Sequence, residues 1–279
     1  MNSVYAPTAR DVLAEPRLYK FRSMADDQQK QRLRDIVLGH RIRFSRPSEL
    51  NDPIEGKPIY ALGDWSSEQY RTQFSEWAWR CQRHVAQPPP QKAFCAWLVQ
   101  QPQQVHQGHI YQINTDNQAE IEKRWRVLSL SADVGHDLMW SHYADGHKGV
   151  ALVFDTSHSE FSLAYEVSYA PRRQPMEITT QDQSAVLKNT LLTKRKTWAY
   201  EKEFRCIAPE VPEPNALHLD NQFLRFAPQL LVGIILGAKL SPGNEAEILS
   251  WSLQREVPLE LSRVIITDAG SVEILAHAL

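Results

Sequence analysis

The chain has 279 residues, of which 42% are hydrophobic and 23% are charged, and its formal net charge is −2. This composition is typical of a globular protein, and the length permits one large domain or two small ones. A net charge so close to zero excludes the strong overall positive field that attracts nucleic acids or anionic membranes, although it leaves local basic patches open.

The sequence carries no sign of export or membrane insertion. Its N-terminal residues lack the apolar core of a signal peptide. The longest apolar run, 230–238, is much shorter than a membrane span. Cys81, Cys95 and Cys206 are odd in number and form no C-x-x-C motif, which disfavours a disulfide framework. We therefore expect a cytoplasmic protein with no membrane partner.

The first half of the chain is predicted to hold two strands and three helices after a loose N-terminal arm. Leu33, Ile36 and Val37 give the first helix one apolar face, and alternating charged and apolar residues favour the strand RIRFS. A stretch rich in Pro and Gln near 86–113 is predicted to be an insertion-like loop. The predicted elements are the arm at 1–16, strands at 17–23 and 41–45, and helices at 26–38, 64–85 and 115–124.

The second half is predicted to contain more strands than helices. The predicted strands are 126–131, 149–154, 165–169, 199–207, 231–236 and 264–267, and the predicted helices are 136–145, 183–196 and 244–254. Helices and strands that do not alternate regularly indicate an α+β fold. We expect a single α+β domain over 17–279, with a split or bent mixed sheet flanked by helices and a cleft between the halves of the sheet.

The segment KRKTWAYEKEFRCIA at 194–208 is a candidate functional site, because it places two acids one residue apart. On a strand, Glu201 and Glu203 would point to the same side and would raise each other's pKa. The pair can be neutralised within a structural network, or it can serve a cationic or electron-poor substrate, as glycosyl transfer requires. The basic side chains available for neutralisation are Lys194, Arg195 and Arg205.

Three sequence blocks carry a resemblance to a known family. LYKFRS…IRFSRPSELNDPIEG, LMWSHYADGHKGVALVFD and TKRKTWAYEKEFRC resemble the bacterial family 2971 of domains of unknown function, from about Leu18 to the segment IILGAKL. The chain departs from the family at 128–131, where it reads LSLS and the family usually has a cysteine and an aromatic residue before the serine. The family name implies no function.

The order of three motifs is also similar to the layout of the ADP-ribosyltransferases. That layout has an Arg or His on a first strand, Ser-x-Ser on a second and Glu-x-Glu on a later one, which here correspond to Arg22, to Ser129 with Ser131, and to Glu201 with Glu203. The resemblance implies an enzyme that cleaves NAD and transfers ADP-ribose to a protein or nucleic-acid acceptor. It further implies a role as a bacterial toxin or phage-defence component.

The resemblance also implies roles for individual residues. Glu203 would bind the ribose 2′-hydroxyl and stabilise the positive charge that develops on the sugar, and Glu201 would orient the acceptor. Arg22 would pair with the diphosphate or a ribose, and Ser131 would hold the site by hydrogen bonding. NAD serves as the substrate, and we expect no metal.

The block HDLMWSHYADGHKG would complete the site. Tyr143 or Trp140 would stack on the nicotinamide, and His142 is a candidate general base. A purely structural role for this block, as a packed Trp–Tyr hinge, remains open. Further residues expected at the NAD site are Ser23, Asn51, Asp52, Ser129 and His147.

Two other functions stay open at this point. A nucleic-acid-binding or sensing module in bacterial defence would use the basic run 194–196 to contact phosphates. A metal-dependent nuclease would be built on Asp52, Glu55, His142 and the acid pair.

Overall fold

The computed structural model describes residues 6–82, 87–157, 160–179, 182–214, 216–268 and 270–276. Its centre is an eight-stranded sheet with the strand order β14-β13-β12-β5-β1-β4-β10-β6. Its neighbouring strands are antiparallel except β12 and β13. The strands are β1 (Arg17–Arg22), β4 (Trp125–Ser131), β5 (Val150–Asp155), β6 (Tyr165–Glu166), β10 (Glu203–Pro209), β12 (Leu231–Leu236), β13 (Glu260–Ile266) and β14 (Val272–Ala276).

Helices and short strand pairs surround this sheet, and the predicted α+β class is confirmed. The small pairs are β2 (Arg41–Arg43) with β11 (Phe223–Arg225), β3 (Tyr60–Ala61) with β8 (Met176–Glu177), and β7 (Ser168–Ala170) with β9 (Thr193–Arg195). The α-helices are α1 (Ala9–Val12), α2 (Asp27–Val37), α3 (Glu68–Gln82), α4 (Gln91–Leu98), α5 (Gln103–Arg124), α6 (Asp137–Tyr143), α7 (Gln183–Leu191) and α8 (Pro242–Leu253). The 3₁₀ helices are η1 (Pro47–Glu49), η2 (Glu160–Leu163), η3 (Lys196–Glu201) and η4 (Pro228–Leu230).

The sheet is split between β1 and β4, in keeping with the split or bent sheet expected from the sequence. β1 pairs with β5 along its whole length, but on its other side it pairs with β4 at a single position, Tyr19↔Ser131. β4 in turn pairs with β10 from Glu203↔Ser131 to Pro209↔Trp125. The halves β14–β1 and β4–β6 therefore meet at one point and diverge beyond it, which leaves the edges of β1 and β4 free to line a cavity.

Alternating residues of β5 explain how helices cover both faces of the larger half. Leu152 and Phe154 belong to the main hydrophobic core, where α2 and α8 pack. Ala151 and Val153 belong to a second cluster, with Trp140 of α6. Side chains of a strand point to opposite faces in turn, so this apolar run buries both of its faces, as a central strand requires.

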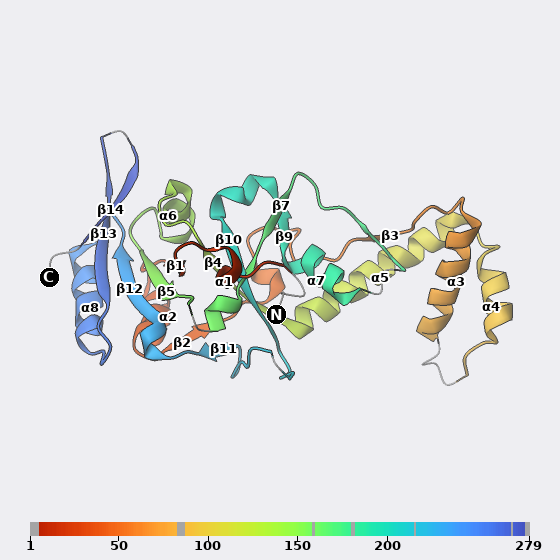
Figure 1. Cartoon of the computed structure of the whole chain (residues 1–279), viewed down its shortest axis with the longest axis horizontal. Coiled ribbons are helices and arrows are strands. Elements are labelled where there is room, and N and C mark those ends of the chain that lie inside the picture. The colour runs from red at the N-terminus through yellow and green to blue at the C-terminus, as the bar shows by residue number, and fades with distance from the viewer. Residues whose placement is uncertain are drawn as a thin grey trace.

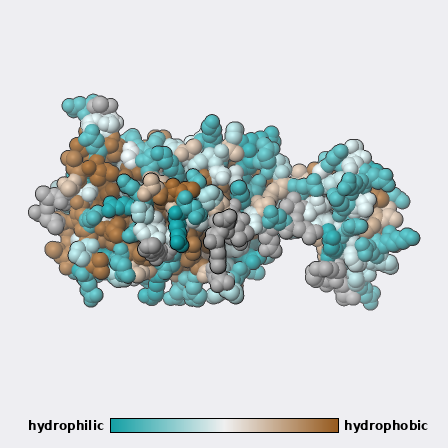
Figure 2. All heavy atoms as spheres, viewed as in Figure 1, coloured by the Kyte–Doolittle hydropathy of each residue, from teal (hydrophilic) through white to brown (hydrophobic). Residues whose placement is uncertain are grey.

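Three helices project away from the sheet as a helical extension, defined here as α3, α4 and the first part of α5 (Figure 1). The extension has its own apolar cluster, which includes Tyr70, Phe74 and Leu98. The other end of α5 packs beside β4 and α7 through Ile121. Hydrophilic residues dominate the visible surface of the extension, whereas apolar residues gather at the opposite end of the molecule, which holds β12, β13 and α8 (Figure 2).

The loop expected near 86–113 is wrong as secondary structure, because α4 and the first half of α5 occupy most of it. The prolines do not oppose these helices, since Pro90 and Pro102 stand at the N-caps, before the first helical residue. Glutamine is a good helix former, so the Gln-rich composition is compatible with α5. Whether the stretch is an insertion stays a prediction.

The N-terminal arm is also not loose where the structure describes it. Ala9 is 1% exposed, and its backbone N–H donates to the Ala164 carbonyl at 2.8 Å. Thr8 forms a β-bridge with Tyr165. These contacts tie residues 6–12 to the edge of the sheet beside β6; residues 1–5 lie outside the described part of the chain. None of the helices described in the structure is long and apolar enough to cross a membrane.

Candidate functional site

A cavity of about 320 Å³ opens where β1 and β4 separate. Consecutive residues 19–23 and 127–131 line it, because the edges of the two diverging strands face the gap. Side chains from α2, β2, the segment around η1, α6, β9, η3 and β10 close the remaining walls. The predicted site residues that line this cavity are Arg22, Ser23, Asn51, Ser129, Ser131, His142, Tyr143, Glu201 and Glu203.

One end of the cavity holds what we call the ion cluster, formed by Glu55, Glu201, Glu203, Lys194 and Arg205. Lys194 Nζ lies 2.5 Å from Glu201 Oε2 and 3.2 Å from Glu203 Oε2. Arg205 donates from Nε to Glu203 Oε1 at 2.7 Å and from Nη2 to Glu55 Oε1 at 2.6 Å. All five side chains are at most 5% exposed, so the cluster combines three carboxylates and two cations in a dry environment.

The backbone brings the acid pair together in a different way from the one expected. The strand predicted at 199–207 begins only at Glu203, and the helix predicted at 183–196 ends at Leu191. Glu201 ends η3, and Lys202 then adopts φ of 40°, the left-handed conformation. This turn, rather than a shared strand face, directs both carboxylates to Lys194 of β9, while Lys202 itself points to solvent and pairs with Asp133.

The two acids of the pair have opposite pKa shifts. Burial alone would raise the pKa of Glu203, but the positive charges of Arg205 and Lys194 outweigh it and hold the value at about 2. Burial and the negative charge of Glu203 raise the pKa of Glu201 above its ordinary value, against the opposing effect of Lys194. Glu203 is therefore the structural anion of the cluster, and Glu201 is the acid whose protonation responds to its surroundings.

Glu201 is also connected to the wall made by α6. Tyr143 Oη donates to Glu201 Oε1 at 2.5 Å, and Asn51 Nδ2 donates to the same tyrosine oxygen. Burial, followed by the charge of Glu201, raises the pKa of Tyr143, so the phenol stays protonated and serves as a donor. His142 Nδ1 lies 3.1 Å from Tyr200 Oη at the rim.

The serine of the second strand holds the backbone of this end. Ser131 Oγ donates to the Glu201 carbonyl at 2.6 Å and accepts from the Asp133 N–H at 3.0 Å. Its expected role of holding the site by hydrogen bonding is compatible with these contacts. They bind the loop that carries Glu201, and they leave Ser131 little capacity for a ligand.

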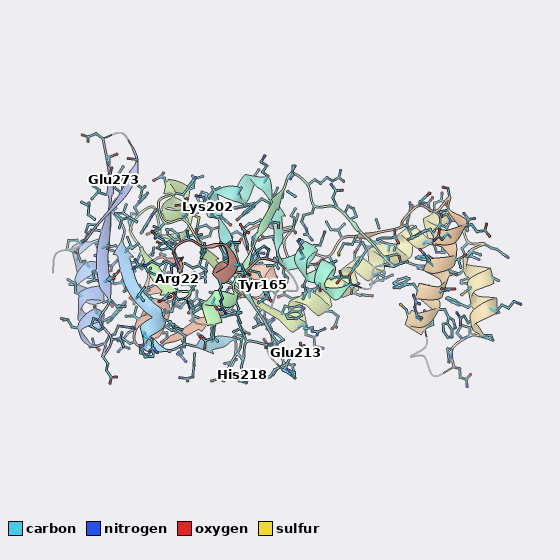
Figure 3. All side chains as sticks on the ribbon, in the orientation of Figure 1. Arg22, Tyr165, Lys202, Glu213, His218 and Glu273 are labelled. Carbon is cyan, nitrogen blue, oxygen red and sulfur yellow. The ribbon has the colours of Figure 1, made fainter. Side chains whose placement is uncertain are left out.

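The other end of the cavity holds the cation pair, Lys20 and Arg22, which share one side of β1. Neither forms an ion pair with a carboxylate within the described part of the chain, and Arg22 Nε is enclosed without a hydrogen-bond partner. Burial and then the nearby charges of Arg32 and Arg43 lower the pKa of Arg22 to about 10. Figure 3 shows Arg22 in the middle of the sheet region, far from the helical extension.

Within the cation pair, Lys20 is the member nearer to the ion cluster. Its Nζ donates to the Ser129 carbonyl at 2.6 Å and so bridges the two diverging strands. Burial, followed by the charge of Arg22, lowers the pKa of Lys20 to about 7 although Glu203 and Glu201 oppose the shift. The sequence analysis missed Lys20; the alternation of two basic residues in RLYKFR was the signal that could have revealed it.

Three residues that were predicted to contact the ligand do not line the cavity. Trp140 is completely buried, donates from Nε1 to the Val134 carbonyl and stacks on His147, so it cannot stack on a nicotinamide. His147 is 4% exposed and pairs with Asp137 at 2.8 Å. Asp52 is 2% exposed and accepts two hydrogen bonds from Arg195. Their polar groups serve the fold, which fits the structural interpretation of the Trp140 block.

The resemblance to the family of unknown function is confirmed over part of the chain. Residues 139–206 match the model of the family described as "Protein of unknown function (DUF2971)". The matched segment runs from α6 into β10 and includes Tyr143, Glu201 and Glu203, whereas the cation pair on β1 lies outside it. No curated protein and no solved structure matches the chain. The similarity to the ADP-ribosyltransferases stays a prediction.

Proposed function

We propose that the chain is an ADP-ribosyltransferase-like enzyme that cleaves NAD in the cavity between β1 and β4 and transfers ADP-ribose to a protein or nucleic acid. The observation that supports this most directly is the division of the cavity into a cationic and an acidic end. NAD carries its positive charge on the nicotinamide ring and its negative charges on the diphosphate, with the bond that breaks between them. A cavity with a cationic end and an acidic end matches such a ligand.

The distance between the cationic end and the acidic end of the cavity also supports the binding of NAD with its diphosphate at the cationic end. Arg22 lies three residues beyond Tyr19 on β1, which is roughly 10 Å at the usual rise of a strand. Tyr19 is level with Ser131, and Ser131 is level with Glu203. The diphosphate would lie against Arg22, whose guanidinium has free donors, and the nicotinamide ribose would lie towards Glu201.

The contacts support different roles for Glu201 and Glu203. Glu203 has both oxygens bound by Arg205, and one of them also meets Lys194, so it acts by fixing those cations and the local field. Glu201 and Tyr143 form the edge that faces the cavity, and a cationic ring beside Glu201 would favour its ionised form. The positive charge that develops on the ribose as nicotinamide leaves would then be stabilised mainly by Glu201.

The two alternatives draw less support from the contacts. In the basic run 194–196, the side chain of Lys194 is 3% exposed and Arg195 is bound to Asp52, so two of the three cations are already engaged. The carboxylates that a nuclease would offer to a metal are occupied by Lys194, Arg195 and Arg205. For an enzyme of the proposed kind, a role as a toxin or phage-defence component is the expected one.

The test compares Arg22→Ala with Arg17→Ala, a change at the other, exposed end of the same strand. Purified protein is incubated with NAD labelled in the adenine, with and without cell lysate, and nicotinamide release and transferred label are measured. We expect both products with the wild-type chain and with Arg17→Ala, and at least a tenfold loss with Arg22→Ala, because a charged hydrogen bond contributes about 1.5–3 kcal/mol. Absence of nicotinamide release with the wild-type chain, together with no binding of ADP-ribose by calorimetry, contradicts the proposal.

A further inference from the structure

Lys20 lines the cavity, and the proposed function gives its amine no role. Its partly exposed side chain lines the cavity, and the Ser129 carbonyl fixes the direction of the amine by accepting one N–H. In the described part of the chain no carboxylate lies within ion-pair distance of Nζ. An amine held in this way leaves its nitrogen accessible to a ligand that enters the cavity.

The surroundings also favour an amine with a free electron pair. The charged groups that face Lys20 are Arg22 on its own strand, Glu203 and Arg205 on β10 and Glu201 on η3. Burial and the two guanidinium groups disfavour the ammonium form, and the acids only partly restore it, so the pKa falls to about 7. About half of the amine is then neutral at pH 7, against roughly 0.04% for an ordinary lysine.

We propose that Lys20 is a nucleophilic lysine that takes a small phosphorylated aldehyde as an imine, with the phosphate held by Arg22. The amine nitrogen attacks the carbonyl carbon, the carbon–oxygen bond breaks, and the oxygen leaves as water with the two amine hydrogens. Arg22, two residues along the same side of the strand, supplies free donors for a phosphate carried by the same ligand. This activity would use the same cavity and the same Arg22 as NAD, but it requires no cleavage of NAD.

The probe is pyridoxal 5′-phosphate, which carries an aldehyde and a phosphate on one ring. The full chain is mixed with the probe at pH 7 and treated with borohydride, which delivers hydride to the imine carbon while water protonates the nitrogen. Peptide mapping by mass spectrometry then locates the stable secondary amine. We expect Lys20 to be labelled at least tenfold faster than Lys92, an exposed lysine of α4 far from the cavity.

Two comparisons separate the aldehyde from the phosphate. Pyridoxal, which lacks the phosphate, is expected to label Lys20 at least tenfold more slowly than pyridoxal 5′-phosphate does, and Arg22→Ala is expected to abolish that difference. Lys20→Gln should lose the label while Lys92→Gln keeps it. The rate of labelling at Lys20 should rise with pH around 7.

Labelling of Lys20 no faster than that of Lys92, or a rate that ignores the phosphate, overturns the proposal. The mapping is done on the wild-type chain, so its result does not depend on whether a variant folds. Nicotinamide release without an adduct at Lys20 removes this inference alone. An adduct at Lys20 with neither nicotinamide release nor binding of ADP-ribose removes the proposed function alone.

Discussion

The two ends of the cavity solve the problem of buried charge in different ways. In the ion cluster, each of Glu55, Glu201 and Glu203 contacts Lys194 or Arg205 through at least one carboxylate oxygen, although Glu55 Oε2 has no hydrogen-bond partner. At the cation pair, Arg22 has an enclosed Nε without a partner, and Lys20 has only a backbone carbonyl. Paired buried charges hold a fold in one arrangement, whereas an unpaired buried cation costs free energy that a bound anion would recover. The comparison therefore separates a structural end from a ligand-binding end.

The largest effect is expected from breaking the ion cluster. Arg205→Met keeps most of the side-chain volume but leaves Glu203 and Glu55 without their main cation. Loss of one partner from a buried network costs about 3–5 kcal/mol, so the free energy of unfolding from urea titration should fall by that amount. The control is Arg124→Ala, which removes an exposed pair with Glu213 and should cost less than about 1 kcal/mol. Equal losses for the two variants would contradict the structural role of the cluster.

A second prediction uses pH, because the ion cluster and the cation pair should change the free energy of unfolding in different pH ranges. The pKa of Glu203 is about 2 in the folded chain, below its unfolded value, so its contribution to stability is present above pH of about 4.5 and is lost as the pH falls towards 2. The pKa of Lys20 is also lowered, to about 7, and the unfolded chain binds more protons between pH 7 and about 10.5. Stability should therefore rise with pH in that window, by at most about 1.4 kcal/mol per pH unit.

The variant Lys20→Met tests this assignment. It should flatten the rise in the free energy of unfolding between pH 7 and 10 and leave the acid-side loss in place, because Glu203 keeps Arg205 and Lys194. Denaturant titrations at several pH values measure both windows. Identical slopes for the wild-type chain and Lys20→Met above pH 7 would show that the amine is an ordinary one.

The smallest effect is expected at the edge between the two ends. Tyr143→Phe removes the phenol that donates to Glu201 and accepts from Asn51. Since each hydrogen bond contributes about 0.5–1.5 kcal/mol, the loss of two should lower the free energy of unfolding by about 1–3 kcal/mol. Tyr111→Phe, at a tyrosine that is 76% exposed on α5, should change nothing measurable. A loss of 3 kcal/mol or more would place Tyr143 in the structural end instead.

Local pattern predicted most of the elements. Apolar periodicity indicated α2, and the sequence also predicted the helices α6 and α8 and the strands β1, β4, β5 and β12. The errors fall where local signals conflict or are weak. Prolines suggested a loop where α4 and α5 follow them, and the edge strand β14, at Val272–Ala276, was not predicted at all.

The candidate site was predicted in part. The motif order placed Arg22, Ser131, Glu201 and Glu203 in one cavity, and the structure brings them there. Trp140, His147 and Asp52 are buried and do not line the cavity. The sequence could not show this, because a polar atom in a sequence does not reveal whether it is already bound within the fold. Lys20 was missed for the converse reason, since only its neighbours make it unusual.

Sequence by itself determined which segments bury apolar faces, because a helix or a strand repeats its side-chain direction every few residues along the chain. It also determined which charges the chain has available near 201–205. Only the tertiary structure decided that β1 and β4 touch at Tyr19↔Ser131 and then part, and that Lys202 turns left-handed before β10. The first depends on a pairing between residues more than a hundred positions apart. The second is a backbone conformation whose contacts are with residues 131 and 132, about 70 positions away, and no local pattern encodes either.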